Sequence, residues 1–161
     1  MNLDQKFLRQ YRSGEGLPAA VRSTSLAEAL GTKLEEIDLL GPSIELSFLV
    51  GEQFLQAEDV IHGGAVTMML DFAMAYAALL AIPDGLSVAT ININVSYLRS
   101  AKPGPYRAVA EVERCGKAVV FTRAQLLDRE NKAVATSVSS LAVVAPRRKS
   151  FIEPPAGAEI A

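Results

Sequence analysis

The sequence predicts an α+β fold in which an antiparallel sheet wraps around one long, buried helix. An apolar segment runs from Ala65 to Ala81, and its length and its content of Ala, Met and Leu are typical of a helix. Two strand-like runs precede this segment and four follow it, which gives the order ββαββββ. A sheet of that size must bury one face, and the apolar helix is the natural filling.

We expect three parts in the chain. Residues 1–25 form an N-terminal helical extension, with a short amphipathic helix over residues 3–11. Residues 26–145 form one folded domain, and residues 146–161 form a loosely ordered tail. Short links predict hairpins between the last four strands, which are therefore antiparallel. The strands are expected at residues 33–40, 43–50, 86–98, 105–115, 118–127 and 132–145.

The central helix carries a single carboxylate. Its only polar side chains are those of Thr67, Asp71 and Tyr76. A helix that is apolar all round is a buried one, so we expect Asp71 inside the protein, where a charged carboxylate needs a partner. At about 17 residues and with this internal acid, the segment is too short and too polar for a membrane span. Thr67 and Asp71 share a helix face with two small residues, Ala75 and Ala78.

Two glycines open the helix. A helix N-terminus leaves up to four backbone N–H groups without partners, and glycines let a ligand approach them closely. Gly63 and Gly64 could therefore hold an oxyanion, or could simply make a tight turn. Gly63 and Asp71 are separated by about 12 Å along the axis, so one carbonyl cannot lie about 3 Å from both. If both act on one substrate they come from different subunits, and we expect a homodimer or a tetramer of two such dimers.

The composition excludes several classes of function. The net charge is −2, so no basic excess indicates a nucleic-acid partner. Cys115 is the only cysteine, which excludes an internal disulfide and makes a reducing cytoplasm the expected location. The start of the chain lacks the apolar run of a signal peptide, and nothing indicates a membrane partner. His62 is the only histidine, so we expect no zinc site.

The segment His62-Gly63-Gly64, with an acid nine residues after the histidine, resembles the motif of the hotdog-fold acyl-CoA thioesterases. The likeness is to the phenylacetate-pathway and 4-hydroxybenzoyl-CoA branches, and it covers roughly residues 26–145. It implies a hotdog fold and hydrolysis of an acyl-CoA thioester to free acid and CoA. No cofactor is implied beyond the coenzyme A that forms part of the substrate.

The resemblance implies roles for individual residues. The N–H of Gly63 would polarise the thioester carbonyl, and Asp71 of the partner subunit would act as general base or as nucleophile. Gln56 matches the Asn or Gln that these enzymes carry six residues before the histidine. His62 would support the loop, although a buried, hydrogen-bonded histidine is an equally good reading.

Thr90 aligns with a hydroxyl residue that orients water in one branch of the family. The alternation of its strand, however, puts Thr90 in phase with Asn92 and Asn94, away from the apolar face that contains Ile91. In the 4-hydroxybenzoyl branch a threonine stands four residues after the acid, where this chain has Ala75. The acyl group therefore stays open.

Coenzyme A carries phosphates, which are bound by Arg and Lys. Arg99 and Lys102 lie in the loop over residues 98–104, where the family often holds the nucleotide. The predicted substrate-binding residues are Gly64, Thr67, Arg99, Ser100 and Lys102.

Two alternatives to the thioesterase remain. One is a non-catalytic hotdog protein that binds acyl-CoA. The other is a hotdog dehydratase acting on a hydroxyacyl thioester, although an acid placed two helical turns after the glycines resembles the thioesterases. A Ser-His-Asp hydrolase is disfavoured because no G-x-S-x-G occurs in the chain.

Overall fold

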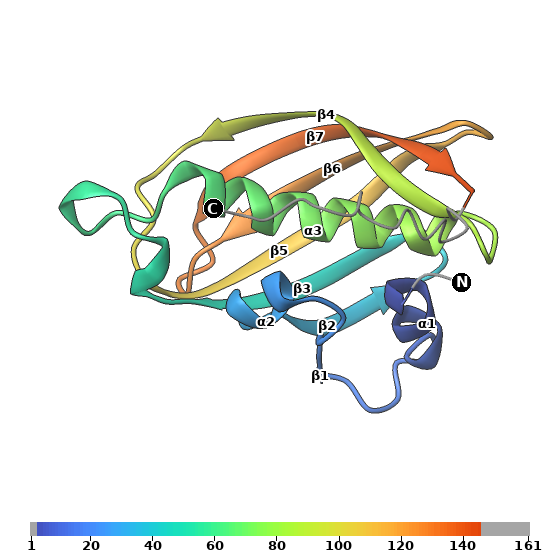
Figure 1. Cartoon of the computed structure of the whole chain (residues 1–161), viewed down its shortest axis with the longest axis horizontal. Coiled ribbons are helices and arrows are strands. Elements are labelled where there is room, and N and C mark those ends of the chain that lie inside the picture. The colour runs from blue at the N-terminus through green and yellow to red at the C-terminus, as the bar shows by residue number, and fades with distance from the viewer. Residues whose placement is uncertain (1–2, 146–161) are drawn as a thin grey trace, which may run out of the picture.

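A computed structural model describes residues 3–145 of the chain (Figure 1). A seven-stranded sheet curves around the helix α3, and two short helices lie near the N-terminus. The predicted α+β fold class is confirmed. The elements are α1 (Leu3–Gln10), β1 (Ala19–Ala20), α2 (Ser25–Ala29), β2 (Lys33–Asp38), β3 (Ser43–Val50), the 3-10 turns η1 (Glu52–Phe54) and η2 (Ala57–Asp59), α3 (Gly63–Ala81), β4 (Ser87–Tyr97), β5 (Gly104–Cys115), β6 (Val119–Leu127) and β7 (Ala133–Val144).

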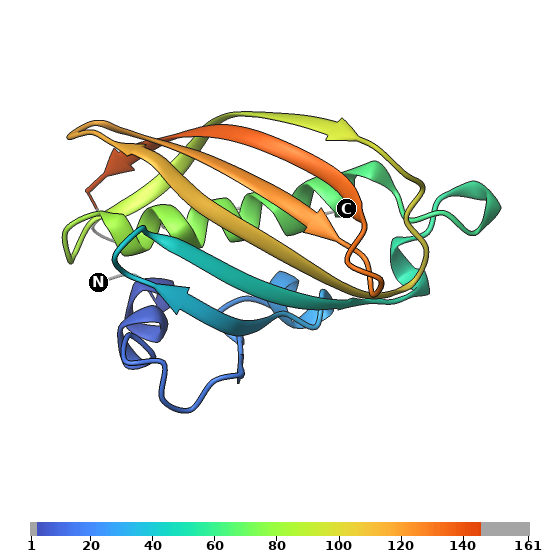
Figure 2. The same cartoon turned by 180° about the vertical axis from the view of Figure 1, so that it is seen from behind.

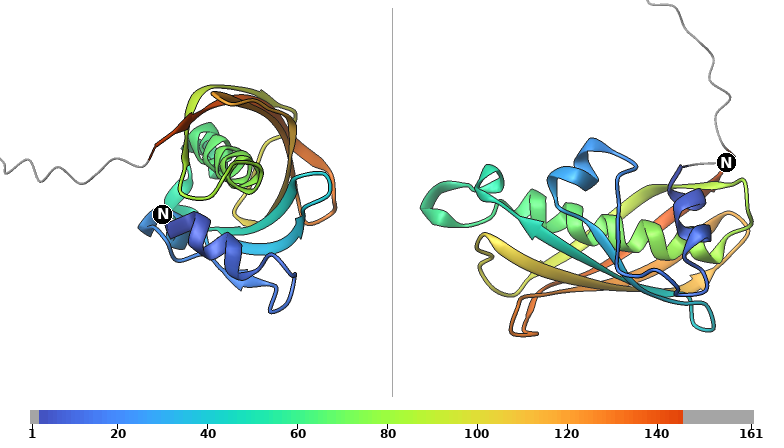
Figure 3. Two further views of the ribbon diagram at one scale, coloured as in Figure 1. Left: turned by 90° about the vertical axis from the view of Figure 1, so that its right-hand side faces the viewer. Right: turned by 90° about the horizontal axis from the view of Figure 1, so that it is seen from below.

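The strands lie in the order β1-β2-β3-β5-β6-β7-β4, and every neighbouring pair is antiparallel. Figure 3 shows the sheet bending around α3, and Figure 2 shows its outer side. Small residues on the helix and on the strands beneath it let the two approach closely, which seats α3 in the curve. Those fully buried are Ala73, Ala77 and Ala78 on α3 and Ala108 and Ala110 on β5.

Local chemistry sets both ends of α3. His62 is the N-cap, with an extended backbone conformation and a side chain that accepts a hydrogen bond from Gly64. Ile82 is extended at ψ 157° because it precedes Pro83, and proline disfavours helical geometry in the residue before it. The helix is long and apolar enough to cross a membrane by length and composition alone, yet most of it is buried inside the sheet, as in a core helix.

One stripe of α3 is not covered by the sheet. The prediction that the helix is buried all round is therefore wrong in part, because the sheet encloses only part of its circumference. Ala78 is fully buried and does not belong to the open stripe, contrary to the predicted shared face. The partly exposed residues are Thr67, Met68, Asp71, Phe72 and Ala75.

The strand that follows α3 pairs differently from the prediction. β4 makes no hairpin with β5. It pairs instead with β7, so that β6 and β7 lie between β5 and β4 in the sheet. The loop after β4 instead crosses one end of the curved sheet, where the Ala101 carbonyl accepts a hydrogen bond of 2.8 Å from Ile61 N–H. This contact places the loop beside the start of α3. β4 is consequently an edge strand, and no strand pairs with its outer side within residues 3–145.

A β-bulge changes the phase of β4. Thr90 pairs with Leu141 and Asn92 pairs with Ser140, so Ile91 is an extra residue without a partner. Ile91 is 59% exposed, and Thr90 takes the inward side, as its buried partner Leu141 does. The prediction that Thr90 points away from the helix is therefore wrong, because one extra residue reverses the alternation.

The N-terminal segment packs onto the same core. β1 pairs with β2, and the side chains of Leu8 and Val21 belong to the hydrophobic core. The expected boundary at residue 26 falls inside α2. The predicted tail, residues 146–161, lies outside the described residues.

Candidate active site

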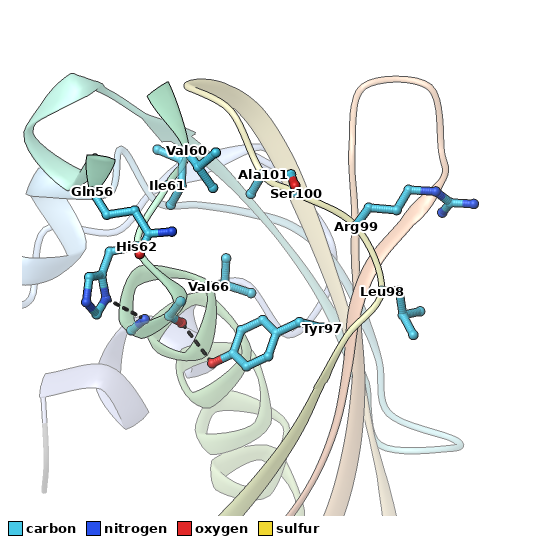
Figure 4. Close-up of a pocket in the computed structure, with 12 residues that line it drawn as sticks. Gln56, Val60, Ile61, His62, Val66, Tyr97, Leu98, Arg99, Ser100 and Ala101 are labelled. Carbon is cyan, nitrogen blue, oxygen red and sulfur yellow. Dashed lines mark hydrogen bonds between the residues drawn. The ribbon is translucent and has the colours of Figure 1, made fainter. Parts of the chain in front are cut away.

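A cleft of about 620 Å³ opens at the N-terminal end of α3 (Figure 4). This volume lies in the range typical of small-molecule sites. Its walls come from the loop before α3, from the first turn of α3 and from the segment that follows β4. The cleft brings together six predicted residues, namely Gln56, His62, Gly63, Gly64, Arg99 and Ser100, and also Tyr97.

His62 uses its side chain to cap α3. Its Nδ1 accepts a hydrogen bond of 2.9 Å from the backbone N–H of Gly64. Because Nδ1 accepts this hydrogen bond, it carries no proton itself. The proton of a neutral His62 is therefore on Nε2. A side chain on residue 64 would place its Cβ 3.0 Å from Nδ1, so glycine at this position leaves room for the cap. His62 therefore has the supporting geometry that the resemblance implied.

The two glycines differ in the state of their N–H groups. The N–H of Gly64 is occupied by His62, whereas the N–H of Gly63 makes no hydrogen bond within residues 3–145. The His62 carbonyl accepts from Ala65 N–H at 2.8 Å, which directs that carbonyl into the helix. Because a trans peptide points its N–H the opposite way, the Gly63 N–H faces out of the helix end, where the dipole favours negative charge.

Tyr97, which was not predicted as a site residue, lies against Gly63. Its hydroxyl donates to the Gly63 carbonyl at 3.1 Å and lies 2.8 Å from Thr67 Oγ1. Thr67 Oγ1 also donates to the Gly63 carbonyl, at 3.0 Å. The alternation of β4 placed Tyr97 on the apolar face, which indicated a core position. The only available signal was that this side chain carries a hydroxyl.

Asp71 lies farther along α3, outside the cleft. Thr90 Oγ1 donates to Asp71 Oδ1 at 2.9 Å, so the inward phase set by the bulge brings this hydroxyl to the acid. Asp71 is half-buried on the open stripe of α3 rather than enclosed. Within residues 3–145 no other hydrogen bond reaches its carboxylate, which leaves lone pairs available to a proton or to water.

A small groove of about 160 Å³ adjoins Asp71. Tyr76 lines this groove and donates a hydrogen bond of 2.7 Å to Asp4 on α1. Burial, followed by the bond to Asp4, raises the pKa of Tyr76, so this phenol stays protonated at neutral pH. The rest of its lining combines the polar residues Asp4 and Ser87 with four apolar residues, which are Phe72, Ala75, Leu79 and Val88.

The predicted phosphate-binding residues point toward the β6–β7 hairpin. Arg99 donates from Nη1 to the Ala133 carbonyl, and Figure 4 shows its side chain directed away from His62. Ser100 lines the main cleft. It also lines a second cavity of about 360 Å³, whose walls include Lys102 and residues of the hairpin. The hairpin itself carries Asp128, whose pKa is held below its usual value by the Lys132 N–H, with a weaker contribution from Arg99.

The supporting role of His62 can be tested by substitution. His62→Asn keeps an N-cap acceptor, whereas His62→Ala removes it and is expected to cost about 1 kcal/mol of stability. Urea unfolding should therefore give His62→Asn close to wild type and His62→Ala a lower midpoint, and kcat should follow the same order. Equal, large losses of kcat in both variants, with His62→Asn fully stable, would assign proton transfer to His62.

Comparison with known proteins places this geometry in a family. A model of the thioesterase superfamily matches residues 58–135, which include the glycines, Asp71 and Thr90. The crystal structure of a candidate thioesterase from Ralstonia eutropha JMP134, a phenylacetic acid degradation-related protein, matches with a TM-score of 0.73 and 31% identity. The match covers 85% of this chain and 98% of that one. The chain belongs to the thioesterase superfamily. Its sheet and central helix are those of the hotdog fold, as the resemblance implied.

Curated relatives in this superfamily are more distant. A candidate esterase of Halobacterium salinarum is 38% identical over 94 residues, which are 53% of this chain and 62% of that protein. The 1,4-dihydroxy-2-naphthoyl-CoA hydrolase of Listeria monocytogenes is 24% identical over 76% of this chain and 98% of that one. The chain spans 62% to 66% of the length of the archaeal candidate esterases that it matches.

Proposed function

We propose that this thioesterase-superfamily protein hydrolyses an acyl-CoA thioester to a free acid and CoA. The observation that carries the proposal is the N–H of Gly63, which lies at the cleft and has no partner within residues 3–145, whereas the N–H of Gly64 is bonded to His62. The enzyme would need no cofactor besides the CoA of its substrate, and it would work in the cytoplasm. A hydrolase that acts on an aromatic acyl-CoA among the relatives supports the substrate class.

Gly63 would stabilise the oxyanion that forms when the thioester carbonyl is attacked. One well-placed donor of this kind contributes on the order of 3 kcal/mol to transition-state stabilisation. The position of the N–H at the positive end of the α3 dipole adds to the effect on a developing negative charge. Gln56, on the same side of the cleft as His62 in Figure 4, would bind the substrate or the water.

Asp71 would act as general base to water or as nucleophile on the carbonyl. In the first route it takes a proton as the water oxygen bonds to the carbonyl carbon, and CoA leaves as thiolate. In the second it forms a mixed anhydride that water then cleaves. The bond from Thr90 leaves part of the Asp71 carboxylate available for either role.

The complete site would form between two copies of the chain. Gly63 and Asp71 are separated by about 12 Å along α3, so the acid that serves one Gly63 would come from the partner. The open stripe of α3, which carries Asp71, would face the partner helix. The outer edge of β4 is eleven residues long and unpaired within residues 3–145, which supports its use as a contact surface.

The small groove beside Asp71 would receive the acyl group. Its volume of about 160 Å³ resembles that of an engineered apolar cavity that binds benzene, so a single ring or a short chain would fit. Phe72 and Leu79 would provide apolar contacts, and Ala75 would leave the space open. In this arrangement the acyl carbon chain would lie on the Asp71 side of the carbonyl and the nucleotide on the Arg99 side.

Release of free CoA tests the proposed function. Purified protein should hydrolyse at least one of a panel of aromatic and short aliphatic acyl-CoAs, detected with a thiol reagent. Binding of these esters without release of CoA would support the non-catalytic alternative. Loss of water from a hydroxyacyl-CoA, without hydrolysis, would identify a dehydratase.

Removing the cationic side chains of the nucleotide end should affect binding more than chemistry. Arg99→Ala and Lys102→Ala are each expected to raise KM for acyl-CoA about three- to tenfold with kcat within about twofold, because phosphate contacts are made equally in ground and transition states. The matched substrate is an acyl-pantetheine, which lacks the nucleotide and should show almost no change in KM. An equal rise on both substrates would contradict a role for these residues in holding the nucleotide.

A further inference from the structure

We propose that Tyr97 is a positioning residue, which together with Thr67 holds the carbonyl of Gly63 and so restrains the residue whose N–H lies beside the cleft. The proposal rests on the proposed oxyanion role of Gly63. Tyr97 is not among the residues predicted from the sequence. In this proposal the hydroxyl of Thr67 binds the protein backbone instead of the substrate.

Both polar atoms of the peptide that joins Gly63 to Gly64 are held by side chains. The Gly63 carbonyl accepts from Thr67 Oγ1 at 3.0 Å and from Tyr97 at 3.1 Å. The Gly64 N–H donates to His62 Nδ1 at 2.9 Å. A Gly-Gly pair has more backbone freedom than any other pair, so contacts beyond those of the first helical turn add to the restraint on this peptide plane. The side chains of His62, Thr67 and Tyr97 provide them from two sides.

The ring of Tyr97 fixes the position of Gly63 as well as its orientation. A Cβ atom added at residue 63 would lie 3.3 Å from both Cζ and the hydroxyl oxygen of Tyr97, and 3.4 Å from Cε1. The ring therefore lies against the glycine with no space for a side chain. Tyr97 as a whole is still 54% exposed, and its side chain forms part of the cleft wall in Figure 4.

The hydroxyls of Thr67 and Tyr97 share one acceptor, the Gly63 carbonyl. Each carries one proton, and the three oxygens of Thr67, Tyr97 and the Gly63 carbonyl lie within hydrogen-bond distance of one another. The two hydroxyls share a single contact, so only one of them can donate to the other. Either hydroxyl can therefore donate to the Gly63 carbonyl. Loss of one hydroxyl leaves one donor, which restrains the carbonyl less well, and loss of both removes its side-chain donors altogether.

Kinetics of three variants test this clamp on the Gly63 carbonyl. Tyr97→Phe, which keeps the ring, and Thr67→Val are each expected to lower kcat about three- to tenfold with KM within about twofold, because the lost contact orients a transition-state donor. The double variant should lose more than the product of the two single losses. Thr67→Ser, which keeps the hydroxyl, should lose less than Thr67→Val. Tyr11→Phe, which removes a tyrosine hydroxyl far from the cleft, is the matched control.

Two kinetic results would overturn the clamp. One is a Tyr97→Phe variant with kcat within twofold of wild type. The other is a rise in KM with kcat unchanged, which would make Tyr97 a binding wall instead of a positioning residue.

A second readout separates the clamp from the proposed function. In a ¹H–¹⁵N spectrum, Tyr97→Phe should shift the Gly63 and Gly64 signals, and in the double variant the Gly64 amide should exchange about tenfold faster. The phenyl ring keeps most of the ring-current effect, so these changes report the hydroxyl. If wild-type protein hydrolyses no thioester but these changes occur, the clamp stands and the proposed function fails. Unchanged glycine signals in the double variant would refute the clamp whatever the activity.

Discussion

Asp71→Asn is expected to lower kcat at least about a hundredfold, because a general base or nucleophile typically contributes that much or more. The asparagine side chain has nearly the shape of aspartate, and its amide oxygen can accept the hydrogen bond that Thr90 donates to Asp71 Oδ1 at 2.9 Å. It cannot take a proton from water or attack a carbonyl. Gly63 and the cleft stay intact, so the Kd for a slow substrate analogue should change less than about threefold.

The matched control for this substitution is Asp38→Asn. Asp38 is the last residue of β2 and accepts a backbone hydrogen bond from Leu40 at 2.8 Å, which asparagine can also accept. Activity should therefore remain at the wild-type level. A folded Asp71→Asn protein that retains more than about a tenth of wild-type kcat would remove Asp71 from the chemistry.

Mixing two inactive variants, Gly63→Val and Asp71→Asn, should restore part of the activity. Gly63→Val pushes a side chain into the ring of Tyr97, since even a Cβ would come within 3.3 Å of it, and so displaces the N–H donor. In a dimer of one Gly63→Val subunit and one Asp71→Asn subunit, one shared site receives both intact groups and the other receives neither. Random pairing of equal amounts should thus give about a quarter of wild-type activity.

The complementation needs two controls. Each parent protein must be folded and show the wild-type oligomeric state by light scattering, and each should be nearly inactive alone. Unfolding and refolding the parents separately before mixing tests whether exchange of subunits is required. If verified mixed dimers stay as inactive as the parents, Gly63 and Asp71 do not serve one substrate from different subunits.

Much of the fold follows from local chemistry in the sequence. The composition of the segment up to Ala81 predicts a helix, His62 caps its start and Pro83 ends it, and each of these acts within a few residues. Strands β3 and β5 carry clear alternation, so their limits are predicted within a residue or two. The spacing of Gly63 and Asp71 in the sequence likewise fixes their separation along one helix, whatever surrounds it.

Tertiary structure alone decided which groups meet across the chain. A period of two along a strand carries no information about its partner, so the pairing of β4 with β7 could not be read from the sequence. The extra residue Ile91 reverses the facing of everything before it, and so brings Thr90 to Asp71. The same strand ends with Tyr97 against Gly63, a contact between residues 34 positions apart. Local sequence therefore determined the helix and the residues that it carries. Strand pairing, which depends on long-range packing, determined which side chains contact those residues.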